Sequence, residues 1–222
     1  MATLLSKRLR QRLFAHHLPL FLASALAAGL LYITRPYTDI LSKLSFATAY
    51  PALILLVLTL LIGPWNLLRR KRNPISSDLR RDFGIWTGIL GLIHAAVGQC
   101  VHLRGRPWLY YVYGANEKKS FPIRHDLFGL ANYTGLLATL FLMLLFATSN
   151  DYALRRLKAP RWKQLQRWNY LVFTLTGIHA IAYQLIETQK RPFVLTVIVS
   201  LFAAILMQGI GFFHRRQILH NS

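Results

Sequence analysis

The sequence predicts an all-α membrane protein, a bundle of six transmembrane helices. The 222-residue chain has 54% hydrophobic residues, and its 27 Lys+Arg and 7 Asp+Glu are confined to short segments. The remaining residues form six charge-free runs of 19 to 25 residues, which are 13–34, 44–68, 83–103, 127–150, 168–186 and 192–214. About 20 apolar residues cross a bilayer core of about 30 Å, so we expect one spanning helix per run. A soluble domain is excluded, because its amphipathic helices would carry charges throughout.

The positions of the basic residues predict how these helices are oriented. The two chain ends and the loops 69–82 and 151–167 hold 18 of the 27 Lys+Arg, and the three alternate loops hold the other 9. Because positive residues concentrate in cytoplasmic loops, both termini are expected in the cytoplasm. The net charge of +20 is therefore a topology signal. It does not indicate nucleic-acid binding, which needs basic residues clustered on one face of a domain.

The chain reads as a single domain over residues 1–222. Four basic residues before a small-residue-rich apolar stretch at 18–33 resemble the start of a signal peptide. Cleavage would leave five spans, so we expect the first helix to remain. No Gly-rich dinucleotide-binding or phosphate-binding motif indicates a soluble nucleotide-binding module. The loop 104–126 holds Trp108 and several other aromatic residues, so we expect it to lie on the membrane surface or to contact a partner.

Two histidines lie inside the third and fifth runs at the same depth. His94 is 12 residues after Asp82, and His179 is 12 residues after Arg167, each counted from the last charge before its helix. Both helices run outward, so both imidazoles reach about 18 Å along their helices at about 1.5 Å per residue. Ionisable groups inside a membrane are expensive, which makes these two histidines candidates for function.

The sequences around these histidines also match each other. Residues 91–99 and 176–184 share an Ile-His-Ala triplet and a glutamine five residues after the histidine. This internal repeat is short, and it falls on the two residues that metal chemistry would use.

We interpret His94 and His179 as axial ligands of one haem iron, held between two helices of the bundle. Small neighbours such as Gly91 and Gly98 leave room for a macrocycle, and Thr176 is expected to orient the His179 ring. Zinc is disfavoured because no cysteine or carboxylate accompanies the pair. The remaining alternative is two independent histidines, each hydrogen-bonded to a neighbouring helix. No catalytic residue is predicted.

Arginines also occur at the inner ends of these two helices. Arg80, Arg81 and Arg167 are placed where they could pair with the carboxylates of a haem. The positive-inside rule requires basic residues at this position in any case, and we take it as the explanation.

The motifs at these two helices resemble a known family. Arg80-Arg81-x-x-Gly84 opens the helix of His94, and Arg161-Trp162-Lys163-Gln164-Leu165 with Asn169-Tyr170-Leu171 precedes Ile178-His179. This pattern is similar to the ferric-reductase-like transmembrane domain, and within it to the YedZ-type haem-binding subunits of bacterial methionine sulfoxide reductase systems. The resemblance implies haem b bound by His94 and His179. Gln166 replaces a further histidine of the family, which argues for one haem instead of two.

The resemblance also implies a role and a location. Electrons would pass from a separate cytoplasmic-side donor, a flavin reductase or a quinol, to an outer-face acceptor, a protein or a small molecule. Some relatives use a flavin, so FMN is a further possible cofactor. The expected location is the bacterial inner membrane, and an electron-transfer subunit is expected more than a stand-alone enzyme. Two alternatives stay open: a haem-dependent ferric or quinone reductase acting itself, and a non-haem small transporter or assembly factor.

Overall fold

The computed structural model describes residues 7, 9–69, 78–103, 106–117, 119–187 and 191–220. Regular structure in these ranges is helical. Long helices are α2 (Leu18–Thr34), α3 (Ile40–Leu68), α4 (Asp78–Gly98), α5 (Leu127–Ala147), α6 (Asp151–Gln166), α7 (Asn169–Ile186) and α8 (Arg191–His220), and short ones are η1 (Leu13–His17), η2 (Pro107–Tyr110) and η3 (Ala115–Glu117).

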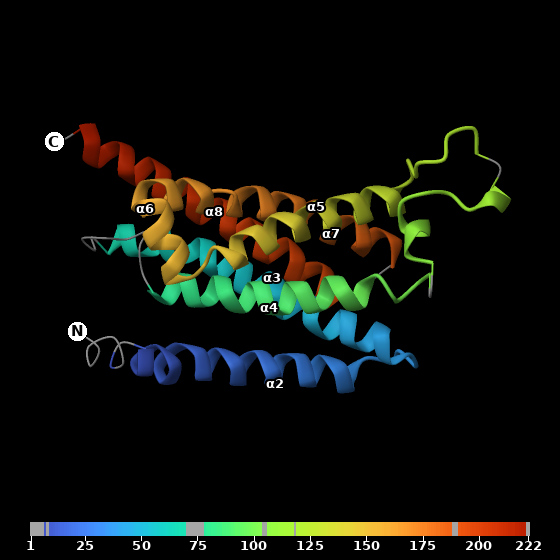
Figure 1. Ribbon diagram of the computed structural model, residues 1–222, viewed down its shortest axis with the longest axis horizontal. Coiled ribbons are helices and arrows are strands. Elements are labelled where there is room, and N and C mark those ends of the chain that lie inside the picture. Colours follow the sequence, from blue (N-terminus) through green and yellow to red (C-terminus); the bar gives the residue numbers. More distant parts are fainter. Residues whose placement is uncertain are drawn as a thin grey trace.

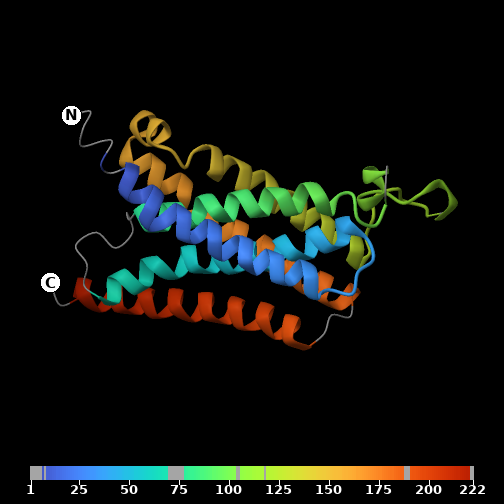
Figure 2. The ribbon, with the colours of Figure 1, turned by 90° about the horizontal axis from the view of Figure 1, so that it is seen from below.

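The long helices other than α6 lie side by side along one axis, and α6, which is kinked at Lys158, lies at one end of the bundle (Figure 1). The N-terminal part of the first helix, which comprises η1 and α2, lies at one end of the bundle together with the C-terminal part of α8. Residues 106–117 and 119–126 lie at the other end, as a second view also shows (Figure 2). Four helices are long and apolar enough to cross a membrane: Leu9–Thr34, Ile40–Leu68, Leu127–Ala147 and Arg191–Gln217. The chain is therefore an integral membrane protein. Helices α4 and α7 are more polar, so the six-span topology with cytoplasmic termini stays a prediction.

Helix α3 lies at the centre of the bundle. In its most apolar stretch of 18 residues, 61% of the residues are buried, against 11% in the corresponding stretches of the first helix and of α8. Phe46, Tyr50 and Val57 of α3 pack against Val197 and Ala204 of α8. On another side of α3, Leu56 packs against buried side chains of α5 and α7. Burial on several sides fixes α3 as the element against which α4, α7 and α8 are positioned.

Helix α6 occupies a segment that was expected to be a loop. The Asn150 side chain caps its first turn by accepting a hydrogen bond from the Ala153 amide, 2.8 Å away. The Trp162 indole donates to the Thr148 carbonyl, 2.9 Å away, which holds α6 against the end of α5. Its basic residues Arg155 and Arg156 are exposed at the end of the bundle that holds the chain termini (Figure 1).

A buried carboxylate joins the first helix to α4. Asp82 is 0% exposed, and its oxygens contact the Arg12 guanidinium, His16 Nδ1 at 2.7 Å and His17 Nε2 at 3.3 Å. The π-helical turn η1 carries both imidazoles on consecutive residues. A buried charge requires such partners, so this contact ties the otherwise peripheral first helix to α4.

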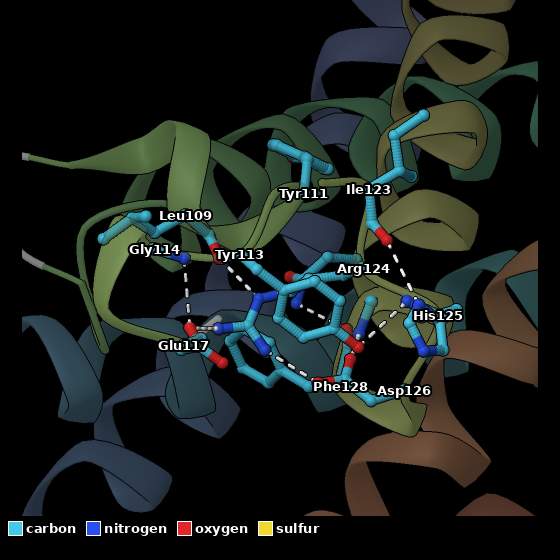
Figure 3. Close-up of polar contacts among 12 residues, drawn as sticks. Leu109, Tyr111, Tyr113, Gly114, Glu117, Ile123, Arg124, His125, Asp126 and Phe128 are labelled. Atoms are coloured by element: carbon cyan, nitrogen blue, oxygen red, sulfur yellow. Dashed lines mark hydrogen bonds and ion pairs between the residues drawn. The ribbon is translucent and has the colours of Figure 1, made fainter. Parts of the chain in front are cut away.

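Residues 106–117 and 119–126, called here the outer lobe, fold around one arginine (Figure 3). Arg124 donates to the Leu109 carbonyl at 2.8 Å and pairs with Asp126 at 2.7 Å and Glu117 at 3.0 Å. Its guanidinium also lies 4.9 Å from the Tyr113 ring centroid. The outer lobe extends beyond the helix ends along the long axis of the bundle, as both ribbon views show (Figures 1 and 2).

The outer lobe is anchored to the bundle through Tyr110. This residue is 0% exposed, and its hydroxyl donates to the Gly98 carbonyl at 3.1 Å and accepts from the His102 amide at 2.8 Å. These bonds satisfy backbone groups at the end of α4. They also explain why α4 ends at Gly98, five residues before the charge-free run ends at position 103.

Replacing Arg124 by leucine is expected to loosen the outer lobe while leaving the helices intact. The variant leaves Glu117, Asp126 and the Leu109 carbonyl without their shared donor. Chymotrypsin should then cleave the outer lobe about tenfold faster, because cleavage reports local opening. Arg106→Leu, at an exposed arginine where the outer lobe begins, is the control. Equal cleavage rates for wild type and Arg124→Leu would contradict the assigned role.

Candidate functional site

Helix α4 places the His94 imidazole against the first half of α3. His94 Nδ1 lies 2.9 Å from the Ser45 carbonyl oxygen and 3.4 Å from the Ser45 hydroxyl. A carbonyl oxygen only accepts, so Nδ1 carries the proton and donates. In the neutral ring this leaves Nε2 as the nitrogen with a free lone pair.

Helix α7 places the His179 imidazole against α5 in the same way. His179 Nδ1 lies 2.8 Å from the Ala131 carbonyl oxygen, so it too donates from Nδ1 and keeps the Nε2 lone pair. The ring packs directly on Gly135, where an added Cβ would lie 2.6 Å from Nδ1. The glycine is therefore required by the close approach of the ring to the α5 backbone.

The two imidazoles face the same space. Their ring centroids are 6.1 Å apart, and their planes make an angle of 76°. Two imidazoles that share one metal have centroids about 6 Å apart, since each bond is about 2 Å and each nitrogen is about 1 Å from its centroid. The observed separation therefore suits one metal ion bound by both rings.

Both rings line a cavity of about 640 Å³ between α3, α4, α5 and α7. This volume is within the range of cofactor sites, about 300–1,000 Å³. Small residues on the helices widen it, including Gly91, Ala95, Gly98 and Ala138. Leu56, Leu142 and Val172 close its inner part with apolar side chains.

The structure places the other residues singled out by the sequence as follows. Gly91 and Gly98 line the cavity, as expected. Thr176 also lines it, but the prediction that Thr176 orients His179 is wrong, because the Ala131 carbonyl does so. Sequence reasoning missed this carbonyl and that of Ser45, since a backbone acceptor has no signature in residue types.

His102 lies beyond the end of α4, at the outer end of the cavity. Its Nε2 is 3.4 Å from a Glu187 carboxylate oxygen, and its ring stacks on Tyr183 with a centroid distance of 6.2 Å. Tyr183 in turn contacts the His179 ring, with centroids 4.9 Å apart. His102 and Tyr183 therefore lie between the imidazole pair and the outer lobe.

The arginines at the inner ends of α4 and α7 do not line the cavity. Arg80 donates to the Thr59 carbonyl at 3.1 Å, and Arg81 pairs with Asp151 at 2.5 Å. Arg167 is exposed. The interpretation of these residues as positive-inside charges stays a prediction.

Gln166 borders a second, much smaller pocket near the inner end. This pocket holds about 10 Å³, roughly the space of one water molecule. The Gln166 side-chain nitrogen is buried there without a hydrogen-bond partner in the described part of the chain. Phe146 of α5 lies directly against Gly88 of α4 and fills the space between these two helices.

The sequence matches the family model described as ferric reductase like transmembrane component over residues 48–177, more than half of the chain. The chain belongs to this family. The match includes all of α4 with His94, as well as α5 and α6, and it ends in α7 two residues before His179. Membership of the ferric reductase-like transmembrane family points to a role in electron transfer within the membrane.

At this site, the ferric reductase-like bundle offers few side chains that can bind a metal ion. Within the described ranges, no group of three or more His, Cys, Asp or Glu side chains is placed to hold a metal ion. A metal bound by His94 and His179 would therefore take its other ligands from outside the protein. A macrocycle with four ring nitrogens supplies such ligands, which is why a haem fits this donor set.

Proposed function

We propose that this member of the ferric reductase-like family binds one haem b and carries electrons from a cytoplasmic-side donor to an outer-face acceptor. The observation that carries the proposal is the pair of imidazoles at 6.1 Å in a cavity of about 640 Å³. His94 and His179 would hold the haem iron, each through Nε2, because Nδ1 of each ring donates to a backbone carbonyl.

The residues around the pair fit a bound haem. The Ser45 and Ala131 carbonyls fix the tautomer and the ring orientation, as outer partners of metal-bound histidines commonly do. Leu56, Leu142 and Val172 exclude water from the inner side of the cavity. A bound haem would supply the one-electron chemistry, and the chain supplies ligation, insulation and tuning.

The inner half of the bundle supports a single haem. Gln166 replaces the family's further histidine and borders only about 10 Å³ of space. The contact between Phe146 and Gly88 closes α5 onto α4 at this level. A second macrocycle would require these helices to separate.

The finer assignments are part of the same proposal. They are the YedZ-type subgroup, six spans with cytoplasmic termini, the bacterial inner membrane, a flavin reductase or quinol as donor, a protein or small molecule as acceptor, and FMN as a further cofactor. We infer that the chain is an electron-transfer subunit, and we favour this role over that of a stand-alone enzyme. The exposed basic residues of α6 support a cytoplasmic location for that end of the bundle.

An optical spectrum with a haem count tests this proposal. The full chain, expressed with ample haem supply and purified in detergent, should show a b-type reduced-minus-oxidised spectrum and about one haem per chain. A colourless protein would contradict it and favour a non-haem transporter or assembly factor. Two haems per chain would contradict the single site. Steady reduction of ferric chelates or quinones by the purified protein would indicate a reductase acting itself.

A further inference from the structure

The internal repeat contains two glutamines that the proposed function does not use. Gln99 follows His94 by five residues, and Gln184 follows His179 by five residues. At about 1.5 Å per residue, both lie about 7.5 Å further out than the imidazoles, Gln184 within α7 and Gln99 directly after the end of α4. Both side chains line the cavity, one from each side of it.

The cavity lining is polar at its outer end and apolar at its inner end. The polar lining residues beyond the imidazole pair include Tyr37, Ser42, Gln99, His102, Tyr183, Gln184 and Glu187. At the inner end Leu56, Leu142 and Val172 line it, and the polar groups there are the hydroxyls of Thr87, Thr139 and Thr176. A ligand with an apolar body and polar groups on one edge would therefore bind with that edge outward.

Gln184 has hydrogen-bonding capacity that its contacts leave unused. Its Nε2 donates to the Tyr50 hydroxyl at 3.0 Å, and its Oε1 is buried without a partner among the described residues. Half a turn of the amide exchanges the two atoms, so the oxygen can accept from Tyr50 while the NH₂ group donates elsewhere. A buried amide in this position gains from a ligand acceptor.

Gln99 lies beside the Tyr111 hydroxyl at the base of the outer lobe, and this hydroxyl is buried without a hydrogen-bond partner among the described residues. Burial raises the pKa of Tyr111, although the neighbouring Gln99 side chain opposes this shift. The Tyr111 hydroxyl is therefore protonated at neutral pH and available as a donor. Gln99 and Tyr111 together offer donors near the outer end of the cavity.

One cation lies behind the outer lining of the cavity, and one carboxylate is part of that lining. Arg35 stacks on Phe46, a lining residue, with its guanidinium carbon 4.8 Å from the ring centroid, and its Nε is buried and unpartnered within the described ranges. The acid at this end, Glu187, lines the cavity, with one carboxylate oxygen 3.4 Å from His102 Nε2. At the inner end, Arg81 is held by Asp151 outside the lining.

We propose that Gln99 and Gln184 form a carboxylate-binding subsite that holds the two propionate groups of the haem at the outer end of the cavity. This inference rests on the proposed function, because it assumes that a haem binds between His94 and His179. Its consequence is a fixed orientation. The carboxylate edge faces the outer lobe, and the apolar edge faces the inner half of the bundle.

Binding of haemin and of its dimethyl ester tests the subsite, since the ester lacks the charged carboxylates. Apoprotein of the full chain in nanodiscs is titrated with each compound, and binding is followed by Soret absorbance. The double variant Gln99→Leu, Gln184→Leu should bind haemin about tenfold more weakly, because hydrogen bonds to charged groups are lost. Its affinity for the ester should stay within about twofold of wild type.

Matched variants at the inner end provide the control. Gln166→Leu removes another largely buried amide on the chain, and Arg80→Gln removes an inner cation. Neither variant should weaken the binding of haemin relative to the binding of its dimethyl ester. Gln184→Glu is a second test at the outer end, because it places a negative charge beside the propionates. It should weaken the binding of haemin and leave the binding of the ester unchanged.

The outcomes separate this inference from the proposed function. Equal loss of haemin and ester in the Gln99 and Gln184 variants, no loss of either, or a haemin-selective loss in Gln166→Leu or Arg80→Gln would each overturn the subsite. Failure of the wild-type apoprotein to bind both compounds would overturn the proposed function, and the subsite with it.

Discussion

Purified His94→Ala and His179→Ala are each expected to lack bound haem, with the b-type spectrum lost. Each change removes one of the two imidazoles that lie 6.1 Å apart in the cavity. Loss of a partner that merely orients a ligand already weakens metal binding by about 10–100-fold. Loss of the ligand itself should therefore weaken haem binding by at least about 100-fold, measured as haem per chain after purification.

Two controls make this result specific to ligation. His125→Ala changes an exposed histidine of the outer lobe and should leave the spectrum unchanged. Added imidazole should restore a b-type spectrum in His94→Ala and in His179→Ala, because a free ligand can enter the space left by the side chain. A variant that keeps an unchanged reduced-minus-oxidised spectrum would show that the altered histidine is not a ligand.

Gly135→Ala is expected to displace the His179 ring, which packs directly on this glycine. The added Cβ would lie 2.6 Å from Nδ1 and 2.8 Å from Cε1 of the imidazole, closer than carbon and nitrogen atoms pack. The ring must move away from α5, which breaks or lengthens its bond to the Ala131 carbonyl. Haem binding should weaken by about tenfold, and the spectrum should shift towards a weakly ligated, high-spin form.

The helix itself should tolerate this change, since alanine is the better helix former by about 1 kcal/mol. Thermal unfolding of Gly135→Ala apoprotein should therefore be close to that of wild type. Gly29→Ala is the matched control, because a Cβ there meets no described atom within 4 Å. Normal haem content and a normal spectrum in Gly135→Ala would contradict the close packing of His179 on α5.

The sequence predicts the depth of the two histidines, but it does not show which helices are neighbours. Counting from Asp82 and from Arg167 placed His94 and His179 at equal depth, because charges mark where a helix enters the hydrocarbon region. The structure places the two rings 6.1 Å apart. Depth alone does not say which helices are neighbours, so this proximity required the packing of α4 and α7 around α3.

Other features had no signature in the sequence. The acceptors of both imidazoles are backbone carbonyls, at Ser45 and Ala131, and any residue type supplies a carbonyl. Helix α6 was missed because its polar, basic composition is also typical of a loop. Asp82 was taken as a marker of a helix end, but it is buried and bonded to the first helix, a contact between segments 70 residues apart.

The closure of the inner half of the bundle has an electrical consequence. With Phe146 packed against Gly88 and only about 10 Å³ of space near Gln166, the imidazole pair is separated from the inner surface by a layer of packed side chains. An electron arriving from the cytoplasm would cross that layer, and with it part of the membrane field. One charge crossing the whole field changes in energy by about 2.3 kcal/mol per 100 mV. The proposed transfer would therefore be electrogenic, and the transmembrane voltage would set part of its driving force.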